Sequence, residues 1–401
     1  MPIFVSRPRS LWKALPVLLV AWSGLLAGPW AVAQNSPETL GDWLYEVDQY
    51  IPDQEANNRL AAAQRSLLRV LTRTTGLVSV PRTPVIVQAL QQPQRYYSKY
   101  VYFNPSAVGE QRRQRIDNAP EDAAQADLAI RFSFQAQAIK QLSRQATLPS
   151  WWSRRPASLA WIVLDTAQGR TVLDANAVDF DRVLQRAAAQ RGLPVLLPTM
   201  DLQDSVLVTP TAVWGKFTDV LDQASARYQV PHYLVGRFSV QEVLGQRFYT
   251  GEWLVRSGNT EFSRFLRGVD FDEVARTGVD MAAQQQLDRH LVFARTVNQH
   301  DLVVTGVDGL AAYVQLLNYL QSLEFVDAVT LLDVRGDALA LGLQSVAGPE
   351  QLKQLLLDDG RFQFPASLAS TEVAPDQVSD HLAEGKTAPG SQTLLQWRPD
   401  S

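Results

Sequence analysis

Cysteine is absent from this chain of 401 residues. Disulfide bonds, a lipid-modified N-terminal cysteine, thiolate metal ligands and a cysteine nucleophile are therefore all excluded. Histidine is also scarce, and the chain holds only His232, His290, His300 and His381. No two of these lie at metal-ligand spacing on one predicted element, so the sequence predicts neither a histidine-based metal site nor a cofactor.

The sequence motifs of several familiar catalytic sites are missing as well. The chain contains no G-x-S-x-G elbow, no P-loop and no G-x-G-x-x-G turn. Charge is low, because charged residues make up 19% of the chain and the formal net charge is −4. A mildly acidic protein lacks the strongly basic surface that binds nucleic acid or an anionic membrane. Neither is therefore expected as a partner.

Long apolar runs are absent after the first 33 residues. Within this leader, three cations precede an apolar stretch at 14–27, and Ala31-Val32-Ala33 forms an A-x-A cleavage site. The three cations are Arg7, Arg9 and Lys13. This order is typical of a secretory signal peptide that is removed after Ala33.

The alternative for this leader is an uncleaved inner-membrane anchor. Its apolar run is broken by proline and glycine and is shorter than the roughly 20 residues that a spanning helix needs. Because the leader carries three cations and no acid, its removal leaves a net charge of about −7. We therefore predict a periplasmic protein of a Gram-negative bacterium, with no transmembrane helix after cleavage.

Composition and patterning predict the α/β class (α+β mixed), with helices packed on mixed sheets. With 46% hydrophobic residues the chain can bury more than one core, so about two to three domains are expected. The predicted organisation is a signal peptide at 1–33, an N-terminal α/β domain at 34–150, a central α/β domain with an antiparallel meander at 151–298, a ferredoxin-like module at 299–365 and a flexible tail at 366–401.

The central stretch 179–267 has the clearest pattern. Its first helix carries an apolar stripe that needs a sheet to cover, made of Phe180, Val183, Leu184, Ala187 and Ala188. Gly192 ends this helix, a short apolar run at 195–197 predicts a buried strand, and a second helix runs from a Thr209 cap to Tyr228. Beyond this helix the period falls to two, which predicts the antiparallel meander.

The N-terminal part begins with a strand predicted at 43–47, followed by a long helix that Gly76 ends. Arginines recur along this helix, at Arg59, Arg65, Arg69 and Arg73. A solvated face is the favoured interpretation of these arginines, and an anion-binding ridge is the alternative. An aromatic-rich strand at 96–103 is compatible with sugar or peptide binding and equally with cross-strand packing.

The C-terminal part predicts the element order β-α-β-β-α-β between residues 302 and 364. This order is typical of a ferredoxin-like βαββαβ module, and such modules are often adaptors. The remaining residues, 366–401, are rich in alanine, serine, proline, glycine and acid and show no sustained period. They are predicted to form the flexible tail.

Two tryptophans and two arginines stand together on the connection between the first two predicted domains: Trp151, Trp152, Arg154 and Arg155. Aromatic faces and guanidinium groups are common binding anchors, so these four are the predicted binding residues. The alternative is that a tryptophan plugs the seam between two domains with an arginine stacked on it. The seam is the favoured interpretation.

Several motifs in this chain resemble, in order and spacing, a proteobacterial family known only as domain of unknown function 2066 (DUF2066). They are Leu71-Thr72-Arg73-Thr74-Thr75-Gly76, the Trp-x-x-Arg-Arg-Pro connection with Ala160-Trp161-Ile162-Val163 after it, the run 191–202, Ala224-Ser225-Ala226-Arg227-Tyr228 and Val235-Gly236-Arg237. The resemblance covers nearly all of the mature chain, and because that family has no established activity it implies no catalytic residue. The order helix, strand, helix, meander is also similar to periplasmic α/β domains of outer-membrane-associated assembly proteins, but this likeness of fold does not fix function.

The best carboxylate pair is Asp201 and Asp204, just beyond the strand predicted at 195–197, where α/β sheets often place their sites. Paired acids could act on a glycan, and His232 at the start of a strand could act as a general base. The structural alternative, that these acids are ordinary loop and cap residues, is favoured.

Two classes of function remain. The favoured one is a non-catalytic periplasmic binding or assembly factor that contacts an envelope protein or peptidoglycan. The alternative is a hydrolase that acts on an envelope polymer through Asp201, Asp204 or His232. The modular plan and the missing catalytic motifs favour the binding factor. This preference rests on general experience of such folds and not on a residue of this chain.

Overall fold

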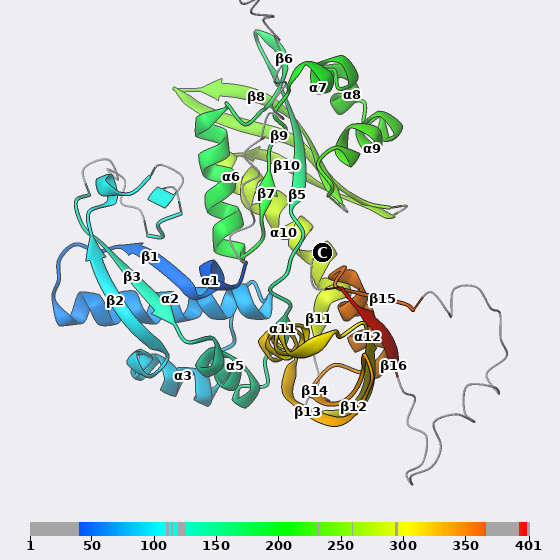
Figure 1. Cartoon of the computed structure of the whole chain (residues 1–401). Helices are drawn as coiled ribbons and strands as arrows, with labels where there is room; N and C mark the ends of the chain where they lie inside the picture. The colour runs from blue at the N-terminus through cyan, green and yellow to red at the C-terminus, as the bar shows by residue number, and fades with distance from the viewer. Residues whose placement is uncertain are drawn as a thin grey trace, which may run out of the picture. The chain divides into compact units, whose positions relative to one another are not determined.

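The structure is a computed structural model that describes residues 40–109, 112–113, 115–118, 126–230, 232–258, 260–292, 296–365 and 393–398. The predicted signal peptide and its cleavage site lie outside these residues. Helices packed on sheets of mixed direction confirm the predicted α/β class (Figure 1). None of the helices in these ranges has both the length and the apolar character that a bilayer crossing requires.

The N-terminal sheet has three strands in the order β1-β3-β2 and is antiparallel throughout. Its strands are β1 (Glu46–Tyr50), β2 (Tyr97–Phe103) and β3 (Ala129–Phe134). The helical elements beside it are α1 (Leu40–Tyr45), α2 (Ala56–Thr75), α3 (Pro84–Gln91), α5 (Ala136–Gln145) and the 3-10 turns η1 (Pro93–Arg95) and η2 (Pro105–Ala107). Leu67 and Leu71 of α2 are buried in one core with Phe132 of β3, so the apolar stripe of α2 covers this sheet.

The strand predicted at 43–47 is wrong in its first part, because α1 extends to Tyr45 and β1 begins at Glu46. Aromatic and β-branched residues favour a strand by propensity. In the fold, the carbonyl oxygens of Trp43 and Glu46 accept hydrogen bonds from Arg73, at 3.2 and 2.7 Å. Tertiary contacts have therefore overridden the local preference.

The central sheet has the order β10-β9-β8-β5-β6, and β7 also pairs with β5. Its strands are β5 (Ser158–Thr166), β6 (Gly169–Val172), β7 (Val195–Leu196), β8 (Tyr233–Val243), β9 (Gln246–Ser257) and β10 (Thr260–Val269). β5 is parallel to β7 and β8, whereas β8, β9 and β10 form the predicted antiparallel meander.

Helices cover both faces of the central sheet (Figure 1). They are α6 (Val178–Arg191), α7 (Leu202–Leu207), α8 (Pro210–Trp214), α9 (Thr218–Ala226) and α10 (Phe271–His290). Alternate residues of β5 point to opposite faces. Ile162 is buried with α6 and α10, and Trp161 is buried with α8 and α9.

The single helix predicted from Thr209 to Tyr228 is in fact two, α8 and α9. Thr209 caps α8 as predicted, because its side chain accepts from the backbone N–H of Ala212 at 3.2 Å. The chain then turns at Lys216, which has a φ of 55° and whose ammonium lies 2.9 Å from Glu252 of β9. This ion pair stabilises a break that helical periodicity does not reveal.

The C-terminal sheet has five strands in the order β13-β14-β12-β16-β15. Its strands are β12 (Asn298–Thr305), β13 (Val326–Arg335), β14 (Ala338–Ser345), β15 (Phe362–Gln363) and β16 (Thr393–Trp397), and its helices are α11 (Gly309–Ser322) and α12 (Pro349–Asp358). The elements from β12 to β15 follow the predicted β-α-β-β-α-β order. The ferredoxin-like module is nevertheless not confirmed, because β16 runs parallel to β12 and separates it from β15.

β16 lies within the stretch predicted as a flexible tail, so that prediction is wrong at residues 393–397. Leu395 and Trp397 are buried, and the Trp397 ring lies 5.3 Å from Tyr319 and 5.0 Å from Phe362 between centroids. A strand of five residues is too short to stand out by its pattern alone. Residues 366–392 of the predicted tail lie outside the described ranges.

Candidate functional site

The connection that carries the predicted binding residues runs along a small two-stranded sheet. Its strands are β4 (Ser150–Trp151) and β11 (Leu291–Val292), which pair antiparallel. Trp151 is buried in the core of the central sheet, whereas the next residue, Trp152, is buried in the core of the C-terminal sheet. Two consecutive side chains thus fill two cores, which agrees with the favoured seam interpretation.

Arg155 is buried against Trp151, with its guanidinium 3.5 Å from the ring centre. It donates hydrogen bonds to the backbone carbonyl oxygens of Trp152 (2.7 Å), Trp151 (3.2 Å), Arg73 (2.6 Å) and Gly192. Burial lowers the pKa of Arg155 to about 9, so the side chain stays charged at neutral pH. This cation is therefore held by carbonyl dipoles and by an aromatic face.

These contacts meet at the C-terminal end of α6. Gly192 follows this helix with a φ of 79°, and a Cβ atom there would lie 2.7 Å from Nη1 of Arg155. Arg73 donates to the carbonyl oxygen of Ala189 at 2.8 Å. The last carbonyl groups of a helix lack partners within it, and cations are favourable there. Two buried arginines thus complete the end of α6.

The arginines of α2 correct the sequence interpretation. Arg73 is buried at the end of α6, and Arg69 binds Asp117 at 2.8 Å. Arg65 donates to the side chain of Gln49 at 2.9 Å. Arg69 and Arg73 thus dock α2 onto neighbouring segments, contrary to both interpretations, whereas Arg65 is exposed and agrees with the favoured solvated face.

Arg154 is the most exposed of the four predicted binding residues. It lies 3.1 Å from both carboxylate oxygens of Asp359, and its guanidinium is 5.0 Å from the ring centre of Tyr319. The structure therefore brings Trp151, Trp152, Arg154 and Arg155 together. Their contacts lie within the chain, so they form a joint rather than an open binding surface.

Asp201 and Asp204 lie at the start of α7, a helix that the sequence analysis does not anticipate. Asp201 caps α7, since its carboxylate accepts from the backbone N–H of Asp204 at 2.9 Å. Arg227, just after α9, binds Asp201 at 2.7 Å and also binds Asp204. Asp204 is fully buried and accepts a hydrogen bond from the Tyr228 hydroxyl at 2.5 Å.

The pKa of Asp201 is shifted in the direction opposite to the one a general acid needs. The hydrogen bond from Arg227 lowers the pKa of Asp201 to about 2. A glycosidase acid requires a raised pKa so that it holds a proton at working pH. The geometry therefore agrees with the favoured interpretation, in which Asp201 and Asp204 are structural residues. Asp201 caps a helix, and both acids pair with Arg227.

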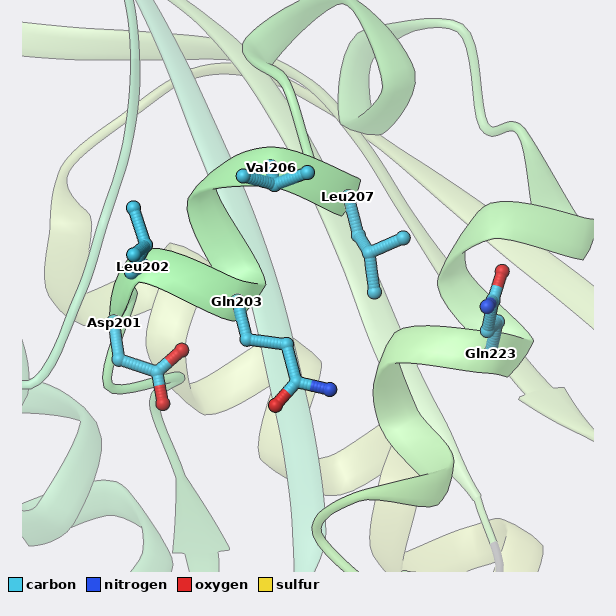
Figure 2. Close-up of a pocket in the computed structure, with 6 residues that line it drawn as sticks. All are labelled: Asp201, Leu202, Gln203, Val206, Leu207 and Gln223. Carbon is cyan, nitrogen blue, oxygen red and sulfur yellow. The ribbon is translucent and has the colours of Figure 1, made fainter.

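An open hollow of about 600 Å³ lies between α7 and α9 (Figure 2). Its lining consists of Asp201, Leu202, Gln203, Val206, Leu207 and Gln223. Figure 2 shows Gln203 and Leu207 projecting from α7 towards α9, which carries Gln223. Asp201 is the sole titratable residue of this lining and is bound to Arg227, so the hollow offers no acid-base pair.

His232 is buried just before β8 and belongs to a separate cluster. Its Nε2 atom lies 2.6 Å from the hydroxyl of Ser158 on β5 and 2.9 Å from the side-chain nitrogen of Gln286 on α10. A serine hydroxyl beside an imidazole is the arrangement of an activated nucleophile, and the sequence analysis missed Ser158. Ser158 has no exposed surface, so no substrate reaches it, and the cluster is a polar part of the core.

No group of three or more potential metal-ligating side chains occurs in the part of the chain that the structure describes. The arrangement therefore provides neither an accessible acid-base set nor a metal centre within these residues.

One exposed surface is built by α11 and the adjoining edge strand β13, and we call it the α11–β13 surface. Its apolar side chains are exposed to between 40% and 76%, and they are Leu310, Val314, Leu331 and Val334. Leu332 of β13 is also exposed, but it lies beside Gly342 on the face of the sheet that α11 does not cover. α11 contains no charged residue in its 14 positions. Exposed apolar patches of this kind mark interaction sites. The signal in the sequence is the missing charge on a helix that has only one buried side.

Comparison with known proteins bears mainly on the N-terminal part. Residues 42–152 match a family described as "Domain of unknown function (DUF8605)". The predicted resemblance to DUF2066 is wrong, because the match is to this different family. The motifs behind that prediction include a glycine-ended helix at 71–76 and a helix-to-strand turn within 191–202, which are features that many α/β folds share.

No curated protein matches the chain. Among solved structures, one described as "Crystal structure of uncharacterized protein" is 12% identical and has a TM-score of 0.14. The alignment covers 33% of this chain and 88% of the other. A TM-score this low supports no argument about fold or function.

Proposed function

We propose that the mature protein is a non-catalytic binding or assembly factor in the periplasm of a Gram-negative cell. The observation that carries this proposal is the α11–β13 surface, where four apolar side chains are exposed on a helix without charge and on a strand at the edge of its sheet. The signal peptide at 1–33 supports the location.

The chemistry of this surface favours an envelope protein over peptidoglycan as the partner. Sugars and acidic peptides would place polar groups against Leu310, Val314 and Val334 without hydrogen-bond partners, which is costly. An apolar protein surface would instead bury these side chains, at roughly 25 cal/mol for each Å² of apolar area. The outer edge of β13 also offers backbone groups to a strand of the partner.

The hydrolase alternative has weaker support. Asp201 and Asp204 are bound by Arg227, and His232 lies in the buried cluster with Ser158. Asp204 and His232 are buried, and the pKa of Asp201 is lowered, which is the wrong direction for a general acid.

The test is cross-linking in living cells from a photoreactive residue placed at position 314, with position 168 in an exposed turn as the control. We expect one envelope protein to be captured reproducibly from position 314 and not from position 168. The captured protein is then purified, and its binding to the mature chain is measured directly.

The double substitution Val314→Lys with Val334→Lys should abolish this binding, because it places two charges in the apolar surface. Gln168→Lys with Gln246→Lys adds the same charge at two exposed positions elsewhere and should leave binding unchanged. The proposal would be overturned if the partner were still captured by the double lysine variant of the α11–β13 surface. It would also be overturned if the cross-linked protein were recovered alone or only as an oligomer of itself. N-terminal sequencing of the exported protein should begin at Gln34, and a start at Met1 would contradict the location.

A further inference from the structure

A second surface lies at the edge of the N-terminal sheet. β2 pairs with β3 on one side, and no strand among the described residues pairs with its other side. Most of this seven-residue strand is exposed, including Val101 at 52%. A long, exposed edge presents unpaired backbone N–H and C=O groups, which is the template for adding another strand.

A groove runs beside this edge, between the first half of α2 and η1. It has a volume of about 230 Å³ and is lined by Ala56, Arg59, Leu60, Ala63, Pro93, Gln94 and Tyr97. Tyr100 follows Tyr97 along β2, so the two rings extend the lining of the groove as an aromatic surface. Tyr100 is 40% exposed, and so is Leu60 on the α2 side of the groove. We call this the α2–β2 groove.

Arg59 is the charged group of the α2–β2 groove. Its guanidinium lies 5.4 Å from the ring centre of Tyr100, and it donates a hydrogen bond to the Tyr102 hydroxyl at 3.2 Å. These contacts hold the side chain over the aromatic surface without neutralising its charge. Glu55 precedes it by one helical turn, but no carboxylate among the described residues lies within ion-pair distance of Arg59.

Two further cations flank the same edge. Arg95 in η1 and Lys99 on β2 are exposed, and neither forms an ion pair with a described residue. By contrast, Arg112 and Arg131 nearby both bind Asp48. Three unneutralised cations around one free edge are a local exception in a chain whose formal net charge is −4.

The cations lie on both faces of the sheet at β2. Tyr100 lies opposite Phe132 on β3 and faces α2, whereas Lys99 lies opposite Ser133 and points to the other face. An added strand sends alternate side chains to these two faces. Its carboxylates could therefore meet Arg59 on one face and Lys99 on the other, while its apolar side chains cover Tyr100 and Leu60.

We propose that the α2–β2 groove binds an extended acidic segment of a partner protein, which adds as a strand to β2. Backbone hydrogen bonds along the edge provide affinity for an extended chain, and the three cations select acidic side chains. This binding uses residues far along the chain from the α11–β13 surface and does not depend on it. The two surfaces together would let one chain hold two partners.

The probe is a short fluorescein-labelled peptide in which glutamate alternates with valine and tyrosine, titrated with the mature chain at low salt and followed by fluorescence anisotropy. A second peptide carries lysine in place of glutamate, and a third carries N-methyl groups on alternate backbone nitrogens. We expect the acidic peptide to bind at least about tenfold more tightly than either control. Added salt should weaken its binding because exposed charges are screened.

Two matched double variants test whether the peptide binds at the β2 edge or at another exposed sheet edge. Arg95→Glu with Lys99→Glu should weaken binding by about tenfold or more. Arg264→Glu with Arg267→Glu makes the same change in charge on β10, another exposed edge strand, and should change binding by less than about twofold. Binding should also slow amide hydrogen exchange in residues 97–103, where the added strand covers backbone groups.

Each of the contrary outcomes overturns the proposal. Equal binding of the acidic and lysine peptides would show that charge does not select the segment. Equal binding of the N-methylated peptide would show that a polyanion is bound without strand addition. A loss of binding in the β10 variant but not in the β2 variant would place the site elsewhere, and no binding of the acidic peptide would refute the site itself.

Discussion

Replacement of Arg155 by methionine tests the physical account of the joint. Methionine keeps much of the length of the side chain but removes every donor. The carbonyl groups of Trp151, Trp152, Arg73 and Gly192 would then lose the hydrogen bonds that Arg155 gives them. We expect the variant to fold with a clearly lower free energy of unfolding.

The magnitude follows from two opposing contributions. A buried carbonyl group that loses its hydrogen-bond donor costs about 1.5 kcal/mol of stability. Four such groups give a gross loss on the order of 6 kcal/mol. Removing a buried charge recovers roughly 2–3 kcal/mol, because the cation no longer has to leave water. The free energy of unfolding should therefore fall by about 3–4 kcal/mol.

Arg154→Met is the matched control, since it removes the neighbouring arginine. The side chain of Arg154 is 36% exposed, and its partner Asp359, with a side chain only 7% exposed, keeps Arg361 at 3.8 Å, so a smaller loss than for Arg155→Met is expected. Arg155→Lys should fall between the two, because one ammonium group cannot reach four carbonyl groups in the planar geometry of a guanidinium.

The assay is urea denaturation of the mature chain, followed by tryptophan fluorescence and circular dichroism. Tryptophan fluorescence includes a contribution from the joint, because the Trp151 ring stacks on Arg155, and circular dichroism follows the whole fold. A change of less than about 0.5 kcal/mol for Arg155→Met, or equal changes for Arg154→Met and Arg155→Met, would refute the reasoning.

Three further predictions concern the acid pair, a buried lysine and β16. Asp204→Asn should lower the free energy of unfolding by about 2–4 kcal/mol because the buried partner of Arg227 loses its charge, whereas Asp201→Asn should cost less because asparagine also caps helices. Burial and the nearby charge of Arg144 lower the pKa of Lys140 from 10.5 to about 8. The folded state therefore gives up this proton before the unfolded state does, and stability should rise by about 1–2 kcal/mol from about pH 8 to pH 10 in the wild type but not in Lys140→Met. A chain that ends after residue 365 lacks β16, so β12 is left without its parallel neighbour and the C-terminal sheet should unfold at lower urea.

Simple measurements decide these three predictions. Urea midpoints at neutral pH rank the two aspartate variants, and a reversed order would contradict the ion-pair account. Midpoints of wild type and Lys140→Met across the alkaline range test the lysine, and parallel curves would count against its burial. Hydrogen exchange in β12 reports on the shortened chain, and unchanged protection would show that β16 is dispensable.

Local patterns predicted the parts of this fold that depend on neighbouring residues. The Thr209 cap, the glycine that ends α6 and the meander from β8 to β10 each follow from a few residues in sequence, and the structure confirms all three. β16 was not predictable in this way, since its partners on β12 lie some ninety residues earlier, by the register that pairs Leu302 with Thr393.

The candidate site shows the same limit. The sequence identified Asp201, Asp204 and His232 as polar residues at element ends, but not the partners that decide their chemistry. Arg227 lies 23 residues beyond Asp204, and Ser158 lies 74 residues before His232. Long-range pairing turned possible reactive groups into structural ones, and no local spacing carries that information.

The position of β16 also constrains the order in which the C-terminal sheet can be completed. β16 sits inside the sheet, between β12 and β15, although it follows both of them in the chain. β12 and β15 are both synthesised before β16, so until residues 393–397 are available β12 lacks its second neighbour and β15 lacks the only one it has among the described strands. The five-stranded sheet can therefore close only after the chain has been made as far as residue 397.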